Sequence, residues 1–206
     1  MSIEPAQPKP RDATLIEFMP AQASSAALAR AALAEFGGNS LIFRALDEPR
    51  VTIYLRDLPE DFAPGHMAEI RARLAPLAAG DIEVSRLAAL RAFVGASRDA
   101  PSRFHYVVRT DIEPGGEDEL ERWYDEEHMP ALAAVPGVIR AERLVSLDAP
   151  PRYYAYYDLT SPAVRQTPEW LAVRETDWSG RVRPMFRHTR RIVSRRLVAA
   201  DEESGS

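Results

Sequence analysis

Short apolar runs recur along the chain, and their periodicity predicts strands alternating with helices. In the first half, the pattern predicts a strand, a helix, two strands, a helix and a strand, at Thr14–Phe18, Gln22–Glu35, Asn39–Leu46, Val51–Leu58, His66–Ala78 and within Glu83–Val94. In the second half, it predicts the same order at Phe104–Thr110, Glu117–Ala134, Val138–Leu147, Tyr153–Leu159, Ala163–Glu175 and Arg187–Leu197. The order β-α-β-β-α-β therefore occurs twice.

A shift of 101 residues supports an internal duplication of the chain. It superposes five identical pairs within one predicted hairpin: Leu46 and Leu147, Asp47 and Asp148, Pro49 and Pro150, Asp57 and Asp158, and Leu58 and Leu159. Asp-x-Pro is also ordinary turn chemistry, because proline fixes the backbone φ angle, so chance similarity of two hairpins is the alternative.

Each half matches the ferredoxin-like split β-α-β plan, in which two helices cover one face of an antiparallel sheet. The predicted strand Tyr153–Leu159 carries large side chains at both parities, which is typical of a sheet covered on both faces. We therefore predict an α+β fold of two tandem ferredoxin-like repeats, whose antiparallel sheets pack into an α/β barrel within one chain.

The expected domain boundaries follow from composition. Residues 1–12 are rich in proline and polar residues and 199–206 are small and acidic, so both ends are expected to be disordered. Residues 13–95 form the first repeat, a degenerate scaffold, and 103–198 form the second, which carries the candidate site. The segment 96–102, with Pro101, is the expected linker.

Composition narrows the class of protein. The 206 residues contain 46% hydrophobic and 28% charged residues and no cysteine, which excludes disulfides, thiolate metal sites and a cysteine nucleophile. No apolar run reaches the roughly 18 residues of a membrane span, and Met1–Arg11 lacks the apolar stretch of a signal peptide, so we expect a soluble, cytoplasmic protein. The net charge of −5 favours neither nucleic acid nor an anionic membrane as partner.

The most informative segment is the predicted helix Glu117–Ala134. Its first turn is acidic, which suits the positive end of a helix dipole. Side chains four residues apart share one helix face, and here they form an apolar stripe that includes one histidine: Leu120, Tyr124, His128 and Leu132. His128 is therefore expected to point inward.

Pro130 should interrupt this helix around Met129, because proline lacks the N–H that would bond to the Glu126 carbonyl and its ring crowds that carbonyl. A helix end near His128 would favour the protonated imidazole, whereas burial would favour the neutral one. Histidine exchanges protons readily at neutral pH, and Tyr124, one turn away, could orient it or bind a substrate oxygen.

The pattern Glu121-x-Trp123-Tyr124-Asp125-x-Glu127-His128-x-Pro130, followed by Val135-Pro-Gly-Val138, resembles the signature helix of the dimeric α/β-barrel superfamily, closest to its EthD-like branch. The stretch Thr176–Pro184 is similar to the end of the second helix in the same proteins. The resemblance covers most of 103–197 and implies enzymes that use a pocket histidine on small carbonyl-containing ligands. It implicates His128, Tyr124 and Glu127. The first half lacks the motif, because Ala27 and Ala23 stand in the equivalent positions.

Further candidates for substrate contact each have a structural alternative. Trp123 could contact substrate or only pack in the core, and Trp178 could line the pocket or seal the barrel mouth. Glu127 could partner His128 or be solvated. Tyr154 and Tyr156 share one face of their strand and could both be core residues, and Arg181 could bind a carboxylate substrate.

Three other site classes are weaker. Seven arginines and no acid occur between Arg181 and Arg196, which invites an RNA-binding interpretation, but nine acids between Asp111 and Glu127 could neutralise them and no RNP1 pattern is present. The four histidines lack metal-ligand spacing, so we predict no metal and no cofactor. By resemblance to related barrels, haem ligation by His128 stays a minor alternative.

We therefore predict a cofactor-independent small-molecule enzyme. His128 would transfer a proton at a carbon next to a carbonyl of a small or aromatic substrate, with Tyr124 holding the oxygen, as an isomerase, cyclase or lyase requires. The alternative is a noncatalytic ligand-binding or structural α/β-barrel protein. A homodimer is compatible with either function, whereas nucleic acid and membrane are not expected partners.

Overall fold

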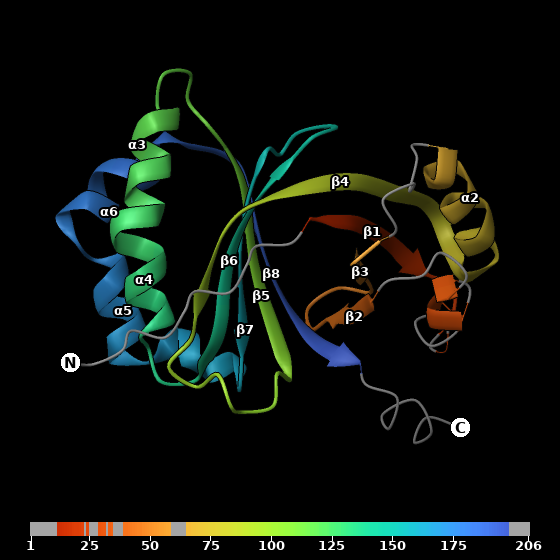
Figure 1. Cartoon of the computed structure of the whole chain (residues 1–206), viewed down its shortest axis with the longest axis horizontal. Coiled ribbons are helices and arrows are strands. Elements are labelled where there is room, and N and C mark those ends of the chain that lie inside the picture. The colour runs from red at the N-terminus through yellow and green to blue at the C-terminus, as the bar shows by residue number, and fades with distance from the viewer. Residues whose placement is uncertain are drawn as a thin grey trace. The chain divides into compact units, whose positions relative to one another are not determined.

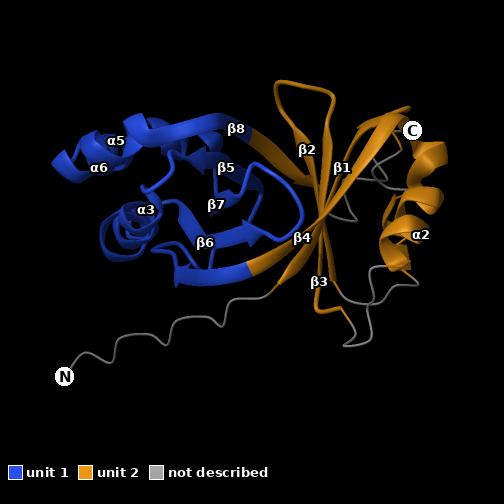
Figure 2. Cartoon of the chain, turned by 90° about the horizontal axis from the view of Figure 1, so that it is seen from above, with its two compact units in different colours: residues 1–10, 89–192 blue, residues 11–88, 193–206 orange. Residues whose placement is uncertain are grey.

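The computed structural model describes residues 12–22, 24, 29–31, 33–34, 39–58 and 65–197. Within them the chain forms two compact units (Figure 2). Unit 1 contains Ala89–Ile192, and unit 2 contains the described residues up to Ala88 together with those from Val193. The boundaries of these units differ from those of the predicted repeats. The reason is that two long strands, β4 (Ala78–Val94) and β8 (Phe186–Leu197), each contribute residues to both units.

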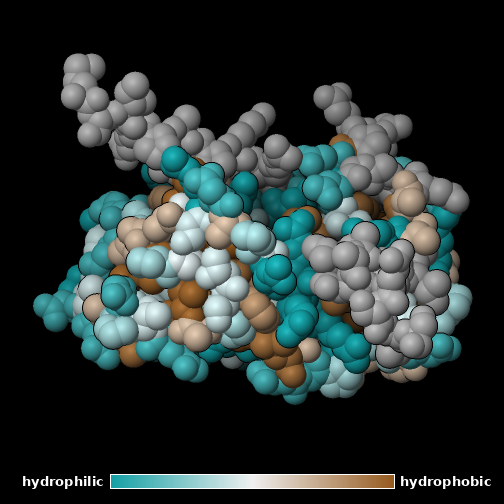
Figure 3. Space-filling model, turned by 90° about the horizontal axis from the view of Figure 1, so that it is seen from below, coloured by the Kyte–Doolittle hydropathy of each residue, from teal (hydrophilic) through white to brown (hydrophobic). Residues whose placement is uncertain are grey.

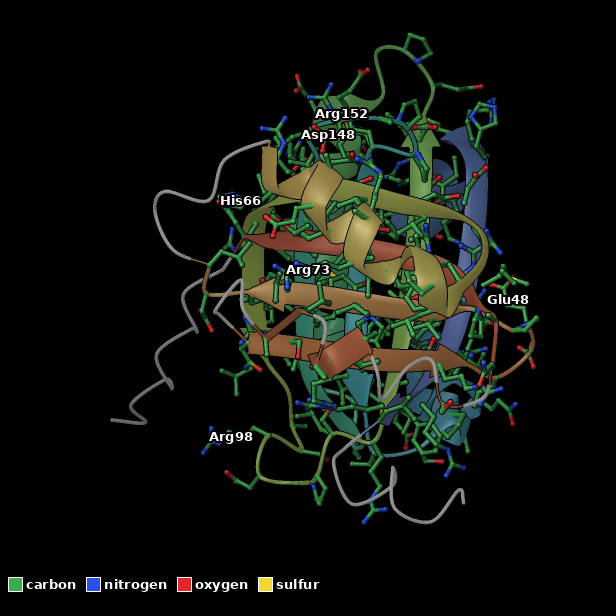
Figure 4. All side chains as sticks on the ribbon, turned by 90° about the vertical axis from the view of Figure 1, so that its right-hand side faces the viewer. Glu48, His66, Arg73, Arg98, Asp148 and Arg152 are labelled. Atoms are coloured by element: carbon green, nitrogen blue, oxygen red, sulfur yellow. The ribbon has the colours of Figure 1, made fainter. Side chains whose placement is uncertain are left out.

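The sheet of unit 2 is antiparallel with the order β4-β1-β3-β2-β8. Its other strands are β1 (Ala13–Pro20), β2 (Asn39–Ala45) and β3 (Val51–Arg56), with Ile16 opposite Ile53 in the register. Helix α2 (Gly65–Leu74) packs across this sheet and buries Ile70 and Leu74 (Figures 1 and 4). The short helix η2 (Ala75–Leu77) leads from α2 into β4.

The sheet of unit 1 repeats this order as β8-β5-β7-β6-β4. It contains β5 (Phe104–Ile112), β6 (Val138–Ser146) and β7 (Tyr153–Leu159), all paired antiparallel. Together the described residues form eight antiparallel strands in an α+β fold. Strands β1 to β4 and strands β5 to β8 thus follow the same ferredoxin-like order.

The helices of unit 1 lie on one side of its sheet (Figure 1). Before β6 they are α3 (Glu117–Arg122), η3 (Trp123–His128) and α4 (Met129–Ala133), which form one continuous helical rod. After β7 they are η4 (Pro162–Gln166), α5 (Pro168–Arg174), α6 (Asp177–Val182) and η5 (Arg183–Met185).

The interruption predicted around Met129 takes the form of a π-helical segment, η3, rather than a helix end. The Met129 N–H bonds to the carbonyl of Tyr124, five residues back, and the helix then continues through Pro130 to Ala133. Because Pro130 cannot bond to Glu126, the preceding turn widens instead of closing with ordinary four-residue spacing. Such π-bulges are frequent at functional sites.

The predicted helix Ala163–Glu175 is wrong in its continuity. The structure has η4 and α5 in its place, and α6 follows beyond it. Each of the three begins with a side-chain cap, at Ser161, Thr167 and Thr176 respectively. Pro162 and Pro168 directly follow two of these caps, where proline starts a helix readily but cannot continue one.

The other predicted elements agree with the structure to within a few residues, except that β4 begins at Ala78, earlier than predicted. Most of the predicted helix Gln22–Glu35 and both expected disordered ends lie outside the described residues. Among the described residues, no helix is long and apolar enough to cross a membrane.

Large exposed apolar side chains are dispersed along the chain, at Met19, Leu46, Leu90, Leu147 and Leu171. On the face in Figure 3, apolar residues are likewise interspersed with hydrophilic ones. Scattered apolar residues are normal for a protein surface and do not mark a binding site. The interior of unit 1 is therefore the better place to look for a functional site.

Candidate functional site

A partly open pocket lies within unit 1, between the helices and the sheet. Its lining residues come from β5, β7, β8 and the helices: Tyr106, Val108, Trp123, Tyr124, His128, Leu132, Tyr157, Trp170, Arg174, Arg183, Phe186 and Arg191. The cavity volume of about 30 Å³ leaves room for only a few water molecules. A larger ligand must therefore displace side chains at the rim.

His128 enters this pocket from the π-helical segment and is 8% exposed, so it points inward as the helical stripe predicts. Its imidazole stacks on the Trp123 indole, with ring centroids 4.1 Å apart and planes inclined by 23°. The Tyr124 ring meets it edge-on at 5.7 Å. The Nδ1 atom is buried and has no hydrogen-bond partner among the described residues. An imidazole with this unused hydrogen-bonding capacity is suited to bind a ligand.

The environment of His128 keeps its imidazole neutral. Burial, together with the smaller effect of the positive charges of Arg183 and Arg174, lowers its pKa to about 3. The sequence left open whether a helix end or burial would dominate. Burial dominates, because the helix does not end at Met129 but continues to Ala133, which places its negative end beyond the turn that carries His128.

Trp123, beneath His128, is held by a buried hydrogen bond. Its indole Nε1 donates to the Ser179 hydroxyl at 3.2 Å, and this hydroxyl donates to the Val173 carbonyl at 3.1 Å. Ser179 and Trp123 are 0% and 1% exposed. The face on which the imidazole stacks is thus fixed by α6, so Trp123 acts as support as well as lining.

Tyr124 is a neutral phenol at the pocket wall. Burial raises its pKa, and the nearby Arg143 only partly offsets that effect. The Arg143 guanidinium lies 4.7 Å from the centre of the Tyr124 ring and binds Glu121 through two hydrogen bonds of 2.7 and 2.8 Å. This contact fixes the ring, so that the hydroxyl can serve as a donor to a ligand oxygen.

Five predicted contact residues lie outside the pocket lining, and three of them belong to the helices. Glu127 accepts a hydrogen bond from the Thr176 hydroxyl at 2.7 Å, which joins η3 to the start of α6, and it is not the partner of His128. The Trp178 indole donates to Glu119 at 2.8 Å on the acidic first part of the rod, and so it does not cover the pocket. Arg181 is exposed.

Tyr154 and Tyr156 lie on the opposite face of the unit 1 sheet from the pocket. The Tyr156 hydroxyl donates to Glu142, and its ring lies 4.8 Å from that of His105. The alternation predicted for this strand is confirmed, because Tyr157 faces the helices and donates to the Met129 sulfur at 3.0 Å. Tyr154 and Tyr156 therefore belong to a second buried polar cluster and do not line this pocket.

Sequence reasoning missed three pocket-lining arginines: Arg174, Arg183 and Arg191. Two of them belong to the arginine run between Arg181 and Arg196, whose charges the acids between Asp111 and Glu127 were expected to neutralise. That interpretation fits Arg187, which pairs with Glu113. The signal in the sequence was that no acid occurs between Arg181 and Arg196. This signal did not indicate which of the arginines face inward.

The residues around His128 do not fit a haem group. The imidazole is stacked on Trp123 at 4.1 Å, and the adjoining cavity of about 30 Å³ has room for only a few waters. A porphyrin axial ligand would need a broad open space in front of one ring nitrogen. Among the described residues, no group of three or more histidine or acidic side chains is placed to hold a metal ion.

Neither family models nor curated proteins match this sequence. Solved structures do match along nearly the whole chain. An anthrone oxidase-like protein has a TM-score of 0.64 at 12% identity, covering 91% of this chain and 92% of its own. The ferredoxin-like α+β fold is therefore shared. At this identity the likeness establishes the fold and not the activity.

Two further structures lead to the same conclusion. A putative monooxygenase from Lactobacillus acidophilus has a TM-score of 0.62 at 13% identity, covering 91% of this chain and 94% of its own. A putative chlorite dismutase has a TM-score of 0.62 at 14% identity, covering 95% and 99%. All three match over both units, so the ferredoxin-like fold extends across the chain.

Proposed function

We propose that this protein is a small-molecule enzyme in which His128 takes up a proton from a carbon next to a carbonyl group of the substrate. The observation that carries the proposal is a neutral, buried imidazole in a pocket, with no hydrogen-bond partner for its Nδ1 among the described residues. Buried polar atoms of native proteins are usually paired. An unpaired one in a pocket is best explained by a ligand that completes it.

The pocket can supply the remaining parts of such a proton transfer. The neutral Tyr124 hydroxyl can donate to the carbonyl oxygen, where negative charge develops as the proton leaves. The aromatic side chains around His128 take the place of part of the surrounding water, which strengthens both interactions. Before the substrate binds, the His128 imidazole has a pKa near 3 and is a weak base. Substrate binding must therefore also make His128 more basic.

We also propose that the chain belongs to the EthD-like branch of the dimeric α/β-barrel superfamily. In this proposal, a tandem duplication forms the barrel within one chain. The signature helix around His128 and the same strand order in both units support this assignment. Isomerase, cyclase and lyase reactions all begin with the proposed step. Because similar structures are described as a monooxygenase and as anthrone oxidase-like, O₂ consumption should be measured as well.

A noncatalytic ligand-binding function is the second candidate. The close stack of His128 on Trp123 and the strongly lowered pKa are also what a buried structural histidine would have. The two functions differ in whether the bound ligand exchanges a proton with the protein.

Deuterium exchange into the substrate separates these candidates without knowledge of the final product. Small aromatic ketones and lactones would be incubated with the protein in D₂O, and NMR would follow loss of the proton next to the carbonyl. We expect exchange with the wild type and with His66→Gln, whose histidine lies in α2 of unit 2 (Figure 4), and none with His128→Gln. Equal exchange by His128→Gln would contradict the proposal, whereas binding without exchange would favour the noncatalytic function.

A further inference from the structure

The charges around the pocket are all of one sign. Arg174, Arg183 and Arg191 line it, and the lining contains no aspartate or glutamate. These residues come from α5, η5 and β8, so the fold brings together three cations that are apart in the sequence. A pocket with three cations and no lining acid is suited to bind an anion.

The guanidinium groups of this cluster are not held by acids, in contrast to other arginines of the unit. Arg183 donates to the backbone carbonyl of Arg174 at 3.3 Å, and no ion pair joins any of the three to an acid among the described residues. Arg143 and Arg187, by comparison, pair with Glu121 and Glu113. The three side chains therefore keep their donors available for a ligand.

This arrangement is electrostatically unfavourable without an anion. Burial lowers the pKa of Arg183, and the charges of Arg174 and Arg191 lower it further. Mutual repulsion of this kind is relieved when a negative charge binds among the three. The arginines are also half-buried or exposed, so their ends can move aside to enlarge the small cavity.

The rest of the lining is mostly aromatic and suits a flat apolar body. Tyr106, Trp123, Trp170 and Phe186 surround the space, and their rings contact one another edge-on or tilted, as in the 6.0 Å contact between Tyr106 and Trp170. Aromatic walls next to guanidinium groups thus select for a ring that carries an acidic group.

We propose that the substrate is an aromatic, or similarly flat and apolar, carboxylic acid, and that Arg174, Arg183 and Arg191 bind its carboxylate. This inference names the substrate class for the proposed function. The reaction of this substrate rests on the proposed function, whereas its binding does not. The bound carboxylate also cancels the positive field at His128, so the substrate itself raises the basicity of the imidazole.

The test compares three probes by isothermal titration: benzoate, its neutral counterpart benzamide, and inorganic phosphate. We expect benzoate to bind more tightly than either of the others, because only benzoate combines a ring with a negative charge. Benzamide binding as tightly as benzoate would overturn the role of charge. Phosphate binding as tightly would overturn the assignment of an aromatic acid.

Matched arginine variants show whether the effect is local. Arg183→Gln and Arg191→Gln should each weaken benzoate binding about tenfold to a hundredfold, as loss of a charged hydrogen bond does. Arg181→Gln removes the same charge from the exposed Arg181 outside the pocket and should leave binding unchanged. Equal weakening by all three variants would mean that net charge, not the cluster, attracts benzoate, and would overturn the proposal.

Two further measurements keep this inference apart from the proposed function. His128→Gln should still bind benzoate, so binding without proton exchange in the wild type would reject the function and leave the substrate class intact. An NMR titration should show a higher pKa for His128 when benzoate is bound than when the pocket is free. An unchanged pKa would show that the anion binds elsewhere and would overturn the assignment.

Discussion

The Trp123 indole N–H donates to the Ser179 hydroxyl at 3.2 Å, and this bond joins the π-helical segment under His128 to α6. Both residues are almost fully buried, so neither group can exchange its partner for bulk water. The bond therefore fixes the plane on which the imidazole stacks. Its loss should affect both the stability of unit 1 and the position of His128.

Ser179→Ala should lower the free energy of unfolding by about 1–3 kcal/mol, because it leaves the buried Trp123 N–H without an acceptor. Urea unfolding followed by tryptophan fluorescence would measure the change. In a Trp123→Phe background, the same substitution should cost less, since no indole N–H is left unsatisfied. Equal costs in both backgrounds would show that the bond makes no specific contribution.

The lowered pKa of His128 predicts a pH-dependent stability. The folded state keeps a pKa of about 3, whereas the unfolded chain has about 6.5, so the unfolded state binds the extra proton between these values. The neutral His128 therefore contributes its full stabilisation to the free energy of unfolding above pH 6.5. This contribution is lost as the pH falls from 6.5 towards 3, by up to about 1.4 kcal/mol per pH unit.

Urea unfolding of the wild type and His128→Gln at pH 7.5, 6 and 5 would measure this contribution. The wild type should lose more stability than the variant on acidification, because glutamine binds no proton in either state. Parallel curves would mean that the folded imidazole titrates near its ordinary pKa.

Local periodicity was sufficient to predict much of the fold and the direction of His128. The strands β5 and β7 alternate as their sequences indicate, and the four-residue stripe places His128 and Tyr124 on the buried face of the rod. These features depend only on side-chain spacing along one element. Pro130 likewise predicted the irregularity, although the widened turn that it produces was not foreseen.

The arginine cluster could not be predicted in this way, because it depends on contacts between elements. Phe186 and Arg191 are five residues apart in β8, which would place them on opposite faces of a regular strand. Both nevertheless line the pocket, and His188 between them adopts a φ of 51°, a left-handed conformation that departs from regular strand geometry. No sequence signal identified His188 as a residue with a left-handed backbone.

Trp178 shows a related difficulty at the rod. The sequence indicated an aromatic residue close to the site but not which helix face it covers. Its indole N–H bonds to Glu119, and the Arg122 guanidinium lies 5.6 Å from its ring, so charged residues of the rod attract it away from the pocket. The break between α5 and α6 sets this orientation.

Arg143 should tolerate replacement by lysine poorly. It is 1% exposed and forms two bonds to Glu121 and one to Asp125, a geometry that a single ammonium group cannot reproduce. We expect Arg143→Lys to lower the free energy of unfolding by about 1–3 kcal/mol. Arg122→Lys, in an exposed pair with Glu126 on the same rod, should change it by less than about 0.5 kcal/mol. Similar losses in both variants would contradict the importance of the two-bond geometry.

Two glycines of unit 1 should respond oppositely to alanine. A Cβ at Gly95 would lie 2.2 Å from the Val138 carbonyl oxygen, and backbone atoms cannot move aside cheaply, so Gly95→Ala should destabilise by at least about 2 kcal/mol. At Gly180, within α6, a Cβ meets open space, and alanine should stabilise the helix by about 0.5–1 kcal/mol. Urea midpoints of both variants, compared with the wild type at one pH, would measure these effects. A stable Gly95→Ala protein would show that β6 can shift away from residue 95, and that the close approach of the two backbones is not required for the fold.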